Sequence, residues 1–155
     1  MGYLELGMLE DALAELDQMA PEAQALLPAR EVRLAVHMQA RQWPKAAEAA
    51  RHLSEIDPSS PQWLTDLAYA TRRAESIEAA EKILLKAAGQ FPKFALIHFN
   101  LGCYTAQMGK LEEALEYVKK AIRLDPSYQQ MAMDDPDLEP IRKRLELGRA
   151  QGPAA

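Results

Sequence analysis

The chain has 155 residues, 48% of them hydrophobic, which is enough for one domain with a packed core. The formal net charge of −5 argues against a general binder of nucleic acid or anionic membranes, because phosphate groups are met by a surplus of lysine and arginine. A single cysteine, Cys103, excludes an internal disulfide and a metal site made of several cysteines.

The first predicted element is an amphipathic helix over residues 8–19, where apolar residues recur at intervals of three and four. A turn at Gly7 is predicted to precede it. This pattern matches only the second half of the units that follow, so residues 1–24 are expected to form half a repeat. Because Met1 then falls within a helix, the sequence is consistent with a fragment of a longer protein.

Three full units follow, each predicted to be a pair of helices joined by a turn, with boundaries at 27–60, 61–94 and 95–128. In the third unit Gly109 separates the two helical patterns, and Pro126 ends the second pattern. Glycine readily adopts the left-handed conformation that closes a helix, and a proline disfavours helical dihedrals in the residue before it. The third unit is therefore predicted to be a helical hairpin.

The segment after the third unit, residues 129–150, is expected to cap the array. Its apolar residues Leu138, Ile141 and Leu145 fall on one helical face, and charged residues occupy the other. Residues 151–155 are predicted to be a frayed tail.

The units repeat with a period of 34 residues. The residues that recur at this interval are Ala12, Ala46, Ala80 and Ala114, and then Pro58, Pro92 and Pro126. Small residues that face a neighbouring helix let two backbones approach closely. The positions expected to make such close contacts are Ala68, Ala80, Ala87, Gly102, Ala114 and Ala121.

With this period the chain resembles the tetratricopeptide repeat family. The positions that match the family's spacing best are Leu101, Gly102, Ala114, Ala121 and Pro126. Three positions depart from the usual residues, with His98 for Trp, Thr105 for Tyr and Val118 for Phe. The resemblance implies an all-α fold, an α-α superhelix (solenoid) of tetratricopeptide helical hairpins. Residues 1–150 would form a single domain of about three full repeats, an N-terminal half repeat and a C-terminal capping helix.

No residue pattern indicates catalysis, and we expect neither an enzyme nor a bound cofactor or metal. The three histidines occupy different positions of their repeats, so no ligand pair with metal spacing arises. His98 and Cys103 lie about 140° apart around one helix, which is too far for a thiolate and its base. The carboxylates are spread at helical spacing, as on a solvated surface.

The resemblance implies that the protein binds a peptide or helical segment of another protein in a concave groove lined by the first helix of each repeat. The groove face of each such helix should recur at i, i+4, i+7 and i+8. The predicted peptide-binding residues are Glu31, Ala35, Met38, Gln39, Thr65, Tyr69, Arg72, Arg73, Phe99, Cys103 and Gln107. The aromatic residues suit an apolar partner side chain and the two arginines a carboxylate. Packing against neighbouring helices is the alternative for these side chains.

Other functions stay open at this point. A self-assembling scaffold could stack repeats into homo-oligomers, with a homo-dimer formed through the N-terminal edge, and a secretion-type chaperone is a narrower form of the interaction module. RNA binding, as in the related pentatricopeptide arrays, is disfavoured by the period and the charge. No apolar run approaches the roughly 18 residues that span a bilayer, and the first residues of the given sequence lack the basic start and apolar core of a secretory signal. We therefore expect no nucleic-acid partner, no membrane insertion and a cytoplasmic location.

Overall fold

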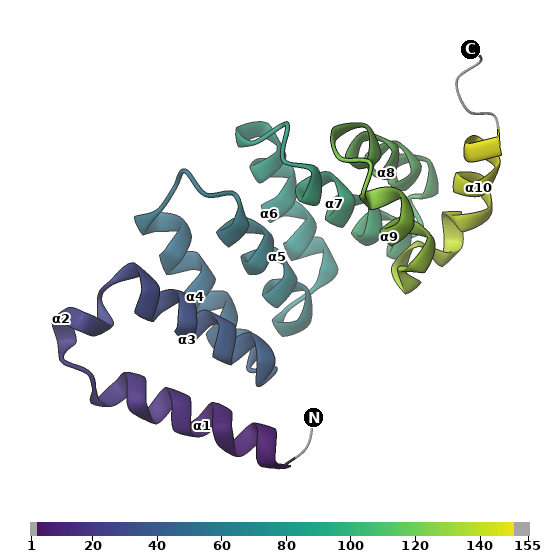
Figure 1. Cartoon of the computed structure of the whole chain (residues 1–155). Helices are drawn as coiled ribbons and strands as arrows, with labels where there is room; N and C mark the ends of the chain where they lie inside the picture. Colours follow the sequence, from purple (N-terminus) through teal and green to yellow (C-terminus); the bar gives the residue numbers. More distant parts are fainter. Residues whose placement is uncertain (1–2, 151–155) are drawn as a thin grey trace. The chain divides into compact units, whose positions relative to one another are not determined.

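The structure is a computed structural model that describes residues 3–150 (Figure 1). Every described element is a helix. The elements are α1 (Tyr3–Gln18), α2 (Pro21–Gln24), α3 (Leu27–Gln39), α4 (Trp43–Ile56), α5 (Gln62–Ala74), α6 (Ile77–Gln90), α7 (Ala95–Gln107), α8 (Leu111–Leu124), α9 (Tyr128–Asp134), the 3-10 helix η1 (Pro136–Ile141) and α10 (Arg142–Ala150). The all-α class predicted from the sequence is confirmed, and the tail predicted at 151–155 lies outside the described residues.

Contacts divide the chain into two compact units, Met1–Ala80 and Glu81–Ala155. The division falls inside α6, and therefore inside the predicted repeat 61–94. The single domain and the repeat boundaries remain predictions, and each unit is described by itself below.

The first unit contains α1 to α5. The turn predicted at Gly7 is wrong, because α1 continues through this residue from Tyr3 to Gln18. A helix tolerates an internal glycine at a cost of about 1 kcal/mol relative to alanine. No other described element lies within 4 Å of the position that a Gly7 side chain would take.

The core of the first unit lies where α4 and α5 pack against each other. Ala46, Ala50 and Leu53 of α4 are fully buried, as are Ala68 and Ala70 of α5. Alanines at these positions keep the two backbones close, because a larger side chain would separate the helices.

The turns after α3 and after α7 are alike, although glycine occurs in only one. Arg41 has a φ of 56° and Gly109 a φ of 78°, both in the left-handed region. The next amide donates to a carbonyl five residues back in each case, Gln42 to His37 and Lys110 to Thr105, at 2.9 Å. This is the Schellman arrangement that ends many helices. The turn predicted at Gly109 is confirmed, and Arg41 forms the same turn without glycine.

The α7/α8 hairpin is the centre of the second unit. A side chain at Gly102 would place its Cβ 2.5 Å from Val118 Cγ2 and 3.3 Å from the Ala114 carbonyl oxygen. Ala114, Val118 and Ala121 are fully buried. The close approach predicted for the small residues is therefore present in this hairpin.

Beyond α8, the chain turns back over α7 through α9 and η1. Leu138 and Ile141 are fully buried and Leu145 is nearly so, whereas Lys143 and Glu146 are exposed. Asp135 fixes the start of η1, because its Oδ1 accepts the backbone N–H of Asp137 at 2.9 Å. The apolar face expected of a cap thus packs inward, with the charges outward.

Candidate functional site

The predicted peptide-binding residues belong to three helices in two separate units. Those of the first unit are Glu31, Ala35, Met38 and Gln39 on α3, and Thr65, Tyr69, Arg72 and Arg73 on α5. Those of the second unit are Phe99, Cys103 and Gln107 on α7.

An exposed aromatic and cationic patch lies on α5 of the first unit. The Arg73 guanidinium carbon lies 3.5 Å from the Tyr69 ring centroid, and Tyr69 is 39% exposed. The Trp43 ring meets the Tyr69 ring nearly edge to face at 5.9 Å and lies 5.2 Å from the same guanidinium. A cation over aromatic faces is attracted by their quadrupoles. We call Trp43, Tyr69 and Arg73 the α5 patch.

Arg73 keeps most of its hydrogen-bonding capacity for a partner. Its Nη1 donates to the Tyr69 carbonyl oxygen at 3.2 Å, and no carboxylate pairs with it among the described residues. Because a guanidinium carries five N–H donors in one plane, the stacked group can still meet a carboxylate.

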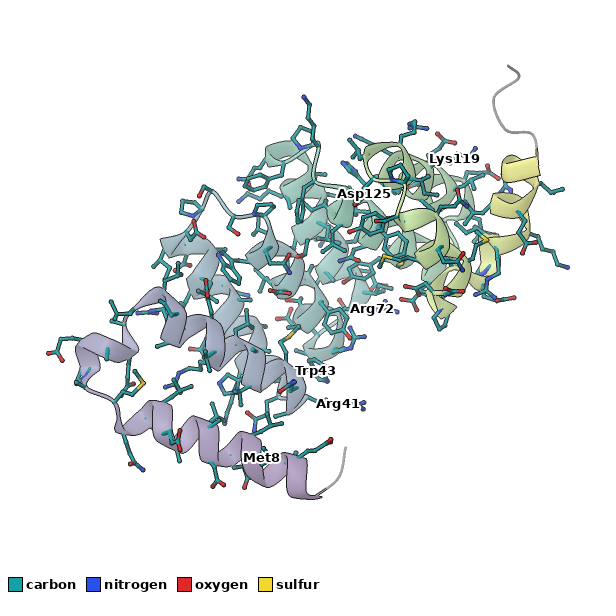
Figure 2. The ribbon with its side chains drawn as sticks, in the orientation of Figure 1. Met8, Arg41, Trp43, Arg72, Lys119 and Asp125 are labelled. Atoms are coloured by element: carbon teal, nitrogen blue, oxygen red, sulfur yellow. The ribbon has the colours of Figure 1, made fainter. Side chains whose placement is uncertain are left out.

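Trp43 is a member of the patch that the sequence did not predict as a site residue. It begins α4, directly after the turn whose exposed Arg41 side chain is labelled beside it in Figure 2. Arg72, also labelled there, is half-buried and has an interaction within the chain. The patch therefore rests on Arg73 and not on the arginine pair.

The other predicted residues of the first unit differ in accessibility. Ala35 and Gln39 are exposed, whereas Glu31 and Met38 are half-buried. Thr65 is buried, and its hydroxyl donates to the Gln62 carbonyl oxygen at 2.7 Å, so its hydrogen bond is already made inside the helix.

The α7 residues contact the chain's own C-terminal segment. Phe99 and Cys103 are each 3% exposed. The Phe99 ring lies 4.9 Å from the Tyr128 ring.

Polar contacts along the same helix face reach further into that segment. The Cys103 thiol lies 3.8 Å from Asp135 Oδ2, and Gln107 Nε2 donates to the Asp137 carbonyl oxygen at 2.8 Å. Residues 128–137 thus cover Phe99 and Cys103 and bind the exposed Gln107.

The groups of the second unit that could carry chemistry are engaged locally. His98 is buried, and its Nε2 lies 2.7 Å from the Pro92 carbonyl oxygen. Among the described residues, one group could offer three ligands to a metal, namely Cys103, Asp135 and Asp137, whose ligand atoms lie within 4.8 Å of one another. These three residues lie close together because Asp135 contacts both the Cys103 thiol and the Asp137 amide, as described above.

The family comparison finds a match in the second unit. The model of the tetratricopeptide repeat matches residues 95–128, which form α7, α8 and the turn between them. A search of curated proteins finds no match. Among the described residues, no helix is both long enough and apolar enough to cross a membrane. Repeats of this family are in general protein–protein interaction modules and typically non-catalytic. The chain therefore contains a tetratricopeptide repeat at residues 95–128.

Proposed function

We propose that this protein binds a peptide segment of a partner protein on the face of α3 and α5, and that the segment carries a carboxylate next to an apolar side chain. The observation that carries the proposal is the α5 patch, in which an arginine that has no carboxylate partner among the described residues is stacked on an exposed tyrosine.

The stacking matters because it fixes the cation before a partner arrives. An arginine that is free in solution loses side-chain entropy when it forms an ion pair. Arg73 is already held by the ring of Tyr69 and by that residue's carbonyl oxygen. A carboxylate could therefore form charge-assisted hydrogen bonds at a smaller entropic cost, while an apolar neighbour contacts the exposed ring edge.

The contrast between the two units supports the choice of face. On α7 Phe99 and Cys103 are covered by the chain's own residues 128–137, and the exposed Gln107 is hydrogen-bonded to the same segment. On α5 of the first unit Tyr69 and Arg73 remain exposed. A partner segment on the first unit would not have to displace those residues.

A displayed library of random peptides tests the proposal. We expect the parent protein to enrich sequences with an acidic group beside an apolar residue, and Arg73→Glu to weaken the best of them by about tenfold to hundredfold, because the charge that meets the carboxylate is reversed. Tyr69→Ala should weaken the same peptides. Lys82→Glu is the matched control, since Lys82 is exposed on α6 and the substitution makes the same charge change.

Amidated and free-acid forms of each enriched peptide distinguish a terminal carboxylate from an acidic side chain. Equal binding of these peptides to the parent and to a folded Arg73→Glu variant would refute the assignment of this face.

A further inference from the structure

The first helix presents an acidic surface with an apolar anchor. Within α1 there are five acidic residues and no lysine or arginine, and the first basic residue of the chain is Arg30. Met8, Asp11 and Glu15 share one face, because they are spaced by three and four residues. Met8 is 71% exposed. Asp11 and Glu15 are also exposed and form no ion pair among the described residues.

The second unit contains a cavity of complementary character, which we call the α8/α10 cavity. It has a volume of about 460 Å³, within the range of about 300 to 1,000 Å³ that is usual for binding pockets. Ile122 and Leu145 provide apolar lining, and Lys119, Arg123 and Arg144 line it with positive charge.

Arg144 is already paired with Glu112 through hydrogen bonds of 2.7 and 2.8 Å, whereas the other two charges at this cavity are open to a further partner. Arg123 has no ion pair among residues 3–150. Lys119 pairs only with the exposed Glu116, at 3.4 Å. An exposed pair of this kind contributes little and can be exchanged for another carboxylate.

We propose that α1 of one copy of this chain docks in the α8/α10 cavity of a second copy. Met8 contacts the apolar lining, and Asp11 and Glu15 meet Arg123 and Lys119. The spacing along the two helices suits this arrangement, since Asp11 and Glu15 lie four residues apart on α1 and Lys119 and Arg123 lie four residues apart on α8, about 6 Å along the axis in each case. Methionine is also flexible enough to fill an irregular cavity.

Charge complementarity within one sequence is the argument for a second copy as the occupant. Every copy carries both the acidic helix and the basic cavity, and the two surfaces are different. The contact is therefore heterologous, so that copies add head to tail and either close into a ring or extend. This inference does not depend on the proposed peptide-binding function, because it uses no residue of the α5 patch.

Two variants, each lacking one side of the contact, test the proposal by sedimentation velocity. The helix variant is Asp11→Arg with Glu15→Arg, and the cavity variant is Lys119→Glu with Arg123→Glu. The parent should gain mass as its concentration rises, whereas each variant alone should associate at least about tenfold more weakly, because two opposite charges become like charges. An equal mixture should recover association, because the unchanged helix of the cavity variant fits the unchanged cavity of the helix variant, and the two reversed surfaces again carry opposite charges.

The control for the cavity variant is Lys82→Glu with Lys86→Glu, which changes the net charge equally on an exposed part of α6 and should associate like the parent. Recovered association in the mixture also demonstrates that both variants are folded.

Three results would overturn the proposal. The parent could stay monomeric at high micromolar concentration, the cavity variant could associate like its control, or the mixture could stay monomeric while the parent associates. If the parent stayed monomeric while a synthetic peptide of residues 3–18 bound the cavity, the occupant would be a similar acidic helix from another protein, and self-association would be wrong.

Discussion

Replacing Gly102 by alanine tests the closest contact between α7 and α8. An added Cβ would lie 2.5 Å from Val118 Cγ2, although carbon atoms pack comfortably at about 3.5 to 4.0 Å. The Ala114 carbonyl oxygen and the Val118 backbone nitrogen, both at 3.3 Å, are further close contacts of the same Cβ. Val118 is fully buried and β-branched, so a change of its rotamer is also costly. The helices must separate or Val118 must leave its preferred rotamer.

The expected change in the free energy of unfolding follows from two opposing effects. Overpacking of a filled core costs about 1 to 3 kcal/mol. Alanine in place of glycine within a helix gains up to about 1 kcal/mol. Gly89→Ala in α6 measures that gain, because no other element lies within 4 Å of its new side chain. We therefore expect Gly102→Ala to be less stable than Gly89→Ala by about 1 to 3 kcal/mol.

Equilibrium urea unfolding followed by circular dichroism gives both free energies. Val118→Ala removes the clashing Cγ2, so Gly102→Ala should cost much less in that background, and the double-mutant cycle isolates the contact. If Gly102→Ala proved as stable as Gly89→Ala, the close approach of α7 and α8 would be wrong.

Two further predictions concern a turn and a buried histidine. Arg41→Gly should stabilise the protein by up to about 1 kcal/mol, because glycine adopts the left-handed conformation of Arg41 without strain. Gly109→Ala should destabilise the protein for the same reason, because alanine would be strained in that conformation. Thermal melts of both variants check these two predictions. Burial lowers the pKa of His98, an effect opposed by its hydrogen bond to Pro92 and reinforced by Lys120. His98 therefore binds a proton more readily in the unfolded chain than in the folded protein. The contribution of neutral His98 to the free energy of unfolding is complete above its ordinary pKa of about 6.5, and it is lost as the pH falls below that value. His98→Gln should lose less stability than the parent between pH 7.5 and 5.5 in urea titrations, and equal losses would contradict the assignment.

The sequence predicts the α7/α8 hairpin well because several independent signals agree there. Apolar spacing marks both helices, Gly109 marks the turn and Pro126 marks the end. At Gly7 the glycine itself was the one feature of the sequence that indicated a turn. A lone glycine can end a helix or continue it, and no other element is close enough to decide, so α1 runs through it.

The candidate site is less predictable because it depends on contacts between elements. Helical periodicity places Tyr69 and Arg73 on one face, but Trp43 joins them only through the packing of α4 on α5. On α7 the same periodicity selects Phe99, whose ring is covered because the segment after Pro126 turns back instead of continuing the repeat. A period of 34 residues carries no information about a segment that leaves the register.

The covering of α7 by residues 128–137 has a consequence for competition. A segment tethered by a short linker acts at an effective concentration of about 1 mM. A free segment that made the same contacts, present at about 1 µM, would occupy this face only about once for every thousand times that the tethered one does. The chain is thus its own strongest competitor at Phe99, Cys103 and Gln107. On the α5 patch Tyr69 and Arg73 are exposed, so the carboxylate proposed to bind there would not have to displace residues 128–137.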